Sequence, residues 1–247
     1  MNKKKMMILF SATTALTLAA CGGNNSSSST TSTEAGTAKT KYASEVTHEG
    51  TPIKGGTLKY AIVSSSPFSG IFADELSQDA TDSSIGGLVD ESMFEYDENR
   101  KLTNTGLASI EFDVENKTAT VTLNSKEYKW SDGQPVTIDD YIFAYQAIGN
   151  KDYTGVRYDG DFKNVVGMEE YHSGKADSVS GLEKVDDYTV KIHFKEMSPS
   201  MQLAGGSVSA YIMPKHIFKD IPEAEWEQSD YVRGKKFVGL GQFKIDS

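Results

Sequence analysis

One residue near the start of the chain combines chemical reactivity with a distinctive context. Cys21 is the only cysteine among 247 residues, so it has no partner for an intramolecular disulfide. Its thiolate would be a good nucleophile for alkylation, and the small residues Ala19 and Ala20 would let a membrane peptidase reach the main chain. The context therefore favours a thiol that is consumed by covalent modification.

The segment before Cys21 has the parts of a secretory signal peptide. Three lysines, at positions 3–5, precede an apolar run at positions 6–18 that is too short to span a bilayer comfortably. The order Leu18-Ala19-Ala20-Cys21 resembles the bacterial lipobox, which implies a diacylglyceryl group on the sulfur and cleavage before Cys21. We expect residues 1–20 to be removed; a plain secretory peptide with a chance cysteine is the alternative.

The residues after Cys21 are expected to hold a folded body away from a membrane. Gly22 to Lys41 is rich in Gly, Ser, Thr and Asn and has almost no apolar residues, so it cannot bury enough surface to fold. We assign residues 21–49 to a lipid anchor and flexible tether. Lipid on two or more chains would anchor stably, where a single chain would be marginal.

The rest of the chain carries no recognisable catalytic or metal-binding motif. Four histidines are scattered through it: His48, His172, His193 and His216. None has the spacing of a metal ligand set, and neither a Gly-x-Ser-x-Gly elbow nor a phosphate loop is present. Asp159-Gly160-Asp161 lacks the remaining ligands of a calcium loop, and Asp139-Asp140 is favoured as a solvated helix start. We therefore expect no enzyme activity, no metal and no cofactor.

Composition excludes one class of partner. The formal net charge is −10, and the first twenty residues contribute three lysines and no acids, so the remainder is more acidic still. This charge argues against binding nucleic acid. A hydrophobic content of 38% fits a folded body, and no second apolar stretch is long enough to be a transmembrane helix.

The elements that would position side chains are strands and helices in mixed order. Alternating apolar residues predict strands over 58–62, 110–114, 119–123, 190–194 and 237–245. Residues 115–117 predict a hairpin turn between the second and third of these. The mixed order indicates an α/β or α+β fold.

Helices are predicted from their caps and from apolar residues at helical spacing. A helix capped by Asp82 or Ser83 should run through Met93 and end near residues 96–99. A second helix, from Ile138 to about Ile148, should begin with Thr137 and Asp140 as a capping box. Its expected buried stripe is Tyr141, Ile142, Tyr145 and Ile148. Shorter helices are expected over 165–171, 199–204 and 214–219, and a surface loop over 151–163. Trp130 and Trp226 are expected in the core.

The stretch from Tyr128 to Tyr141, YKWSDGQPVTIDDY, resembles the signature of the extracellular solute-binding proteins of family 5, which bind oligopeptides, dipeptides or nickel. The signature residues are Trp130, Ser131, Asp132, Gly133, Pro135 and Thr137. Physically the motif is structural: a strand end, a tight Asp-Gly turn and a capped helix start. Further matches lie at 55–58, 94–97, 107–108, 167–171 and 185–190, of which 167–171 resembles the peptide-binding branch.

The resemblance implies a class II periplasmic-binding-protein-like fold of the mixed α/β kind. Residues 50–76 and 198–247 would form parts of an incomplete first lobe that carries the sheet, and residues 77–197 a smaller inserted domain. Family members are longer and close a ligand between two lobes, so the second lobe is expected to be absent and the chain to be truncated. Residues 239–242, Gly-Leu-Gly-Gln, depart from the family's Gly-Thr-Gly-Pro.

The resemblance also places the ligand. By position, contacts would come from the loop after the first strand and from an aromatic residue beyond the motif helix. These residues are Ser77, Gln78, Asp79 and Ala80 in the loop, and Tyr153 or Tyr158.

The expected function is that of a lipid-anchored oligopeptide-binding receptor of an ABC peptide importer. It would be a monomer at the extracytoplasmic face of the cell membrane of a Gram-positive bacterium, and would deliver extended short peptides to membrane permease subunits. The alternatives are a surface or interaction fragment without a transport role, and a family member that binds dipeptides or nickel.

Overall fold

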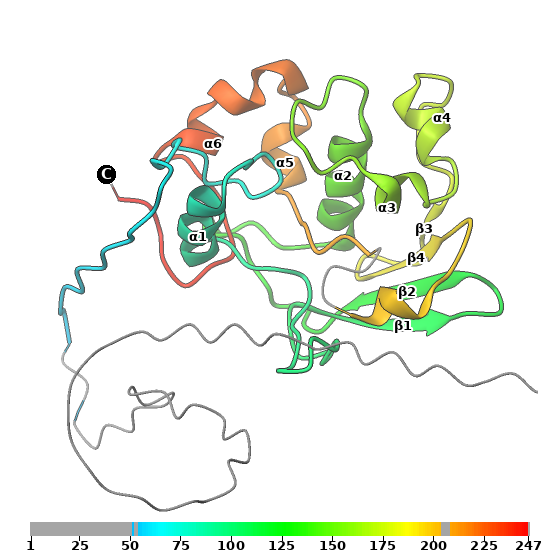
Figure 1. Ribbon diagram of the computed structural model, residues 1–247, viewed down its shortest axis with the longest axis horizontal. Coiled ribbons are helices and arrows are strands. Elements are labelled where there is room, and N and C mark those ends of the chain that lie inside the picture. The colour runs from blue at the N-terminus through cyan, green and yellow to red at the C-terminus, as the bar shows by residue number, and fades with distance from the viewer. Residues whose placement is uncertain (1–50, 52–53, 204–207, 247) are drawn as a thin grey trace, which may run out of the picture. The chain divides into compact units, whose positions relative to one another are not determined.

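The computed structural model describes residues 51, 54–203 and 208–246, so Cys21, the expected signal peptide and the whole expected tether lie outside it. The chain divides into two compact units, Met1–Lys59 and Tyr60–Ser247. All helices and strands of the described residues belong to the second unit (Figure 1). None of these helices is long and apolar enough to cross a membrane.

A four-stranded antiparallel sheet forms one layer of the second unit. Strands β1 (Ala108–Asp113), β2 (Thr118–Leu123), β3 (Leu182–Lys184) and β4 (Thr189–His193) lie in the order β1-β2-β4-β3. Ile110, Val121 and Val190 are cross-strand neighbours and all three are buried, so one sheet face belongs to the core. The predicted hairpin at 110–123 and the strand at 190–194 are confirmed.

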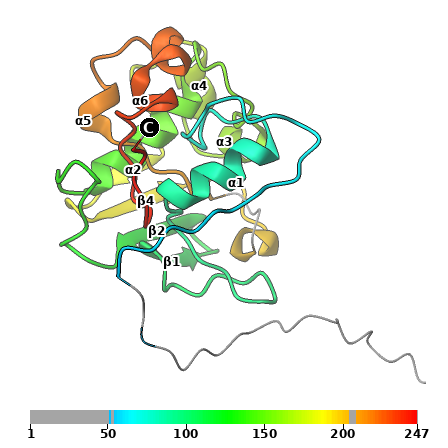
Figure 2. The same cartoon turned by 90° about the vertical axis from the view of Figure 1, so that its left-hand side faces the viewer.

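Helix α2 (Ile138–Gly149) packs beside β3 and β4 (Figures 1 and 2). Asp140 Oδ2 accepts a hydrogen bond from Thr137 N at 2.9 Å, which confirms the predicted capping box. Tyr141, Tyr145 and Ile148 are buried as expected, whereas Ile142 is only half-buried. The helix therefore presents two buried tyrosines to the interior of the fold.

Helix α1 (Ala80–Val89) begins earlier than its sequence indicated. The prediction of Asp82 or Ser83 as its cap is wrong, because Asp79 accepts from Thr81 N at 2.7 Å and caps the helix. Asp82 is buried inside the helix and accepts from Ser69 N at 2.7 Å. The helix ends at Val89, short of the expected end near residues 96–99.

Two predicted strands do not form. Residues 58–62 have no strand geometry, and Leu58 and Tyr60 are 88% and 77% exposed. Residues 237–245 run in irregular conformation beside the C-terminal end of α1, where Gly241 N donates to Val89 O at 3.0 Å. An alternating pattern needs a neighbouring strand to supply hydrogen bonds, and neither segment has one in the described part of the chain.

Short helices fill the remaining connections. The expected helical segments appear as α4 (Met168–His172), η1 (Pro199–Gln202) and α5 (Lys215–Phe218). Three others were not predicted: α3 (Gly160–Lys163), η2 (Glu223–Gln228) and α6 (Asp230–Arg233). The expected loop over 151–163 thus ends in a helical turn capped by Asp159.

The buried apolar side chains form two clusters. The first joins the sheet to α2 and contains Trp130; the second contains Phe218, Trp226 and Val232 from the C-terminal region. Both tryptophans are only 2% exposed, which confirms their expected place in the core. The residues that line the cavity of the candidate functional site lie beside these clusters.

Candidate functional site

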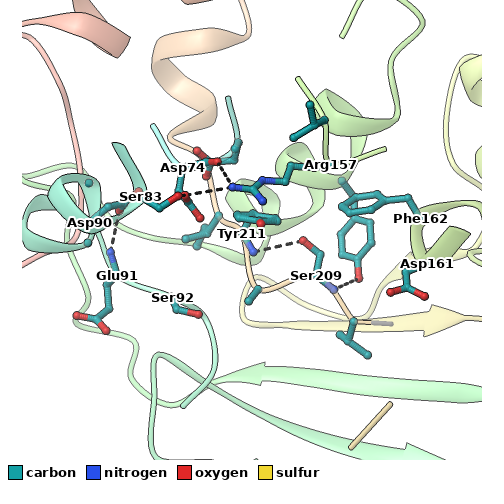
Figure 3. Close-up of a pocket in the computed structure, with 18 of the residues that line it drawn as sticks. Asp74, Ser83, Asp90, Glu91, Ser92, Arg157, Asp161, Phe162, Ser209 and Tyr211 are labelled. Carbon is teal, nitrogen blue, oxygen red and sulfur yellow. Dashed lines mark hydrogen bonds and ion pairs between the residues drawn. The ribbon is translucent and has the colours of Figure 1, made fainter. Parts of the chain in front are cut away.

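A cavity of about 480 Å³ opens between α1, the loop that precedes α3, and the extended segment 208–212 (Figure 3). Six of its lining residues carry carboxyl groups. Its lining residues include Asp74, Glu75, Asp90, Arg157, Ser209 and Tyr211.

Two tyrosines of α2 fix one side of the cavity. Tyr141 donates its hydroxyl to Ser209 O at 2.6 Å, and Ser209 N donates to the Tyr145 hydroxyl oxygen at 2.9 Å. All three residues are buried, so both main-chain polar groups of Ser209 would be costly to leave unpaired. The buried stripe of α2 thereby sets the position of segment 208–212.

Segment 208–212 presents unpaired main-chain groups. Met93 N donates to Ala210 O at 3.0 Å, which ties the segment to the chain after α1. Within the described residues no hydrogen bond reaches Ala210 N or Tyr211 O. Buried or half-buried main-chain groups are nearly always paired in proteins, so this edge is suited to an extended ligand.

Arg157 lies at the centre of the cavity wall (Figure 3). Its Nη2 lies 3.3 Å from Asp74 Oδ1 and 3.3 Å from Ser77 Oγ, and its guanidinium stacks over the Tyr211 ring at 5.3 Å from the centroid. Its Nε is buried without a hydrogen-bond partner in the described part of the chain. The guanidinium therefore links the loop that precedes α1 to segment 208–212, and its Nε donor is unpaired among the described residues.

The carboxylates of the cavity perturb one another. Burial, followed by repulsion from Asp90, raises the pKa of Glu75 well above its ordinary value. Burial likewise raises the pKa of Asp90 to about 7, against hydrogen bonds from the main-chain N–H groups of Glu91 and Leu240. Burial also raises the pKa of Tyr211 to about 12, so its hydroxyl is neutral at physiological pH. Perturbed acids in a cleft are a feature of functional sites.

The loop residues expected to touch a ligand lie at the edge of this region. Ser77 is buried and its hydroxyl contacts Asp74 and Ser83, so it supports the wall. Gln78, Asp79 and Ala80 line an open hollow that shares Arg157 with the main cavity. The structure places Asp79 and Ala80 at the start of α1 rather than in a free loop.

The two candidate aromatic residues separate. The Tyr153 hydroxyl donates to Glu75 O, so this side chain braces the cavity wall from behind. Tyr158 instead stacks on His172, with ring centroids 3.9 Å apart, and does not belong to the cavity lining. Of the pair, Tyr153 is the one connected to the site.

The signature residues form a turn away from the cavity. Trp130 Nε1 donates to Asp140 Oδ2 at 3.3 Å, and Asp132 pairs with His216 at 2.8 Å. Gly133 has φ +92°, a conformation that favours glycine. Their contacts hold the start of α2, which in turn holds Tyr141 and Tyr145.

Sequence reasoning missed most of the cavity. Arg157 stands alone in a polar stretch, and Ser209 and Tyr211 belong to a segment without a clear pattern. In the sequence, Asp159 and Asp161 indicate only an incomplete calcium loop, but both residues line the cavity. The available signal was the isolated arginine in an acidic chain, which requires acidic partners when it is partly buried.

Comparison with known proteins gives a consistent family. The model of the bacterial extracellular solute-binding proteins, family 5 Middle, matches residues 104–247, more than half of the chain. The oligopeptide-binding protein OppA of Lactococcus lactis subsp. cremoris is 37% identical over 190 residues. That match covers 74% of this chain and 31% of OppA, so the chain spans about a third of the length of its curated relatives.

Solved structures show the same fold. Lactococcal OppA, in complex with an endogenous peptide in the closed conformation, matches with a TM-score of 0.67 at 35% identity over 73% of this chain and 34% of that one. AppA of Bacillus subtilis, in complex with a nonapeptide, matches with a TM-score of 0.59 at 26% identity over 73% of this chain and 32% of that one. The predicted mixed α/β, periplasmic-binding-protein-like fold is thereby confirmed.

Proposed function

This chain belongs to the bacterial extracellular solute-binding proteins of family 5, and from that premise we propose that it binds extended short peptides as the receptor of an ABC importer. The relatives named above are oligopeptide-binding proteins. The family consists of solute-binding proteins rather than enzymes. The cavity beside segment 208–212 is the proposed binding site.

The observation that carries this proposal is the unpaired main-chain edge of segment 208–212. An extended peptide laid beside it would accept a hydrogen bond from Ala210 N on one edge or donate one to Tyr211 O on the other, because consecutive residues of an extended segment direct their main-chain groups to opposite sides. Main-chain pairing of this kind gives affinity with little dependence on ligand sequence, which suits a receptor for many peptides. The buried tyrosines of α2 hold the edge in place before the ligand arrives, which lowers the cost of ordering it.

Calorimetry with modified peptides tests this pairing. A nonapeptide of fixed sequence would be compared with versions methylated on one main-chain nitrogen at a time. Each methyl removes one donor and leaves its acceptor unpaired, which costs about 1–3 kcal/mol. We expect about a tenfold loss of affinity or more at the paired position and small changes elsewhere.

Two outcomes would contradict the proposal. A uniform small effect of methylation at every position would show that main-chain pairing does not hold the peptide. No binding heat from the folded, monodisperse chain would favour the alternative of a surface or interaction protein without a transport role. Tighter binding of dipeptides or nickel than of longer peptides would redirect the ligand class.

We further propose that Cys21 carries the lipid anchor and that the receptor delivers its peptide to a membrane permease as a monomer. The lone cysteine and its signal-peptide context support the anchor. A division between a lobe that contains residues 50–76 and 198–247 and an inserted domain at 77–197 is part of the same proposal; the second hydrophobic cluster joins Leu76 to Phe218 of that lobe and also contains Ala144 and Ala147 of α2. Metabolic labelling with a fatty acid, compared between the unchanged chain and Cys21→Ser, tests the anchor.

A further inference from the structure

The wall of the cavity carries more acidic side chains than cationic ones. Six carboxylates line it, at Asp74, Glu75, Asp90, Glu91, Asp159 and Asp161. Arg157 is the single cation among the described lining residues, and it is already engaged by Asp74. Asp159 is occupied as the cap of α3. Glu75, Asp90 and Glu91 also line the cavity, and among the described residues none of these three forms an ion pair.

Glu75 has the environment of a residue that awaits a partner. It is 3% exposed and lines the cavity. Among the described residues, none donates a hydrogen bond to its carboxyl group from another position. As far as the structure describes the chain, the carboxyl group accepts a hydrogen bond from its own main-chain N–H only. Ionising a buried carboxyl group with so few donors is costly, and a cationic ligand group would lower that cost by supplying both charge and hydrogen bonds.

The arrangement suits an organic cation better than a metal ion. Within the described part of the chain, no three His, Cys, Asp or Glu side chains are grouped so that they could hold a metal. The acids are instead spread around the wall, with Asp90 and Glu91 on one side of Tyr211 and Asp161 on the other (Figure 3). A volume of about 480 Å³ has room for a long side chain beside the main chain that carries it.

We propose that this cavity is a subsite for a lysine or arginine side chain of the bound peptide, with Glu75 as its buried partner and Asp90 and Glu91 as supporting charges. The proposal rests on the peptide-binding function proposed above and adds a preference among peptides. The Tyr211 ring, which also lines the cavity, would pack against the stem of that side chain.

A ligand series in the unchanged full chain tests the subsite. In an alanine-based nonapeptide, one position at a time would carry lysine, norleucine or glutamine, and the Kd of each peptide would be measured by calorimetry. We expect one position at which lysine binds about tenfold or more tightly than norleucine and glutamine. Raising the salt concentration should weaken the lysine peptide more than the norleucine peptide.

A matched pair of variants assigns the effect to the cavity. Glu75→Gln should reduce the lysine preference by about tenfold, whereas Glu115→Gln, which removes the same charge from the β1–β2 turn, should leave it unchanged. The ligand series needs no variant, so it decides the question even if Glu75→Gln fails to fold.

The outcomes separate the two proposals. Peptides that bind with equal affinity whether they carry lysine, norleucine or glutamine would overturn the cationic subsite and leave the peptide receptor standing. A preference for glutamine over lysine would show that Glu75 acts as a neutral hydrogen-bonding group, and would also overturn the subsite. Failure of every peptide to bind would overturn the receptor function itself.

Discussion

The two α2 tyrosines offer a way to loosen the cavity edge without touching the cavity charges. Replacing both by phenylalanine removes the hydroxyl donor to Ser209 O and the hydroxyl acceptor of Ser209 N, which lie 2.6 and 2.9 Å from those atoms. The aromatic rings stay, so the packing of the first hydrophobic cluster is retained. The change isolates the hydrogen bonds that set segment 208–212.

The magnitude follows from the burial of the groups left behind. Ser209 is 7% exposed, so each unpaired group costs about 1–3 kcal/mol. The two losses affect the same residue and will not add fully, so we expect the double variant to lose about 2–4 kcal/mol of unfolding free energy. In the double variant, a bound peptide would have to order the loosened segment, and this reduces the free energy of binding. We therefore expect about a tenfold weaker peptide affinity.

Urea unfolding and calorimetry measure both quantities on the same preparation. Tyr128→Phe is the matched control, because Tyr128 packs against the same cluster and its hydroxyl makes no hydrogen bond among the described residues. We expect it to change both quantities little. A double variant that loses stability but binds peptide as tightly as the unchanged chain would refute the placement of segment 208–212 in the binding site.

Three further changes test the supports of the site. Asp140→Ala removes the acceptor of three hydrogen bonds, from two main-chain N–H groups and an indole, and should lower the unfolding free energy by about 3 kcal/mol in urea titration; Asp140→Asn should recover part of it. The pKa of Asp90 is raised from 3.8 to about 7, so the folded state holds this proton where the unfolded state has lost it. Stability should therefore fall as pH rises from about 4 to 7, and Asp90→Asn should flatten part of that slope, by about 1–2 kcal/mol; an unchanged slope would contradict the assignment. Gly241→Ala places a Cβ 2.4 Å from the main-chain carbon of Val89 and should lower the melting temperature by several degrees, whereas Gly87→Ala, in open space, should not.

Local signals predicted the parts of the fold that are locally determined. The β1–β2 hairpin has strict alternation on both sides of a three-residue polar turn, and α2 has a capping box followed by apolar residues at helical spacing. These features fix structure within a dozen residues. The strands expected at 58–62 and 237–245 depend on neighbours distant in sequence, and alternation alone does not supply a neighbour.

The site was less visible in the sequence than the fold. Arg157, Asp74 and Tyr211 lie far apart along the chain and meet only through tertiary packing. The signature at 128–141 identified the family, yet its own residues lie outside the cavity and act by holding α2. Sequence reasoning found the frame of the site through that signature, whereas the groups that face a ligand required the structure.

The most direct test of the account is a nuclear magnetic resonance titration that follows the amide signals of segment 208–212 as peptide is added. We expect the Ala210 N–H signal to change its chemical shift strongly and to become protected from hydrogen exchange, because the peptide supplies the missing acceptor. Peptide binding that leaves this amide unchanged and still exposed to exchange would contradict the central claim that the cavity edge pairs with the ligand main chain.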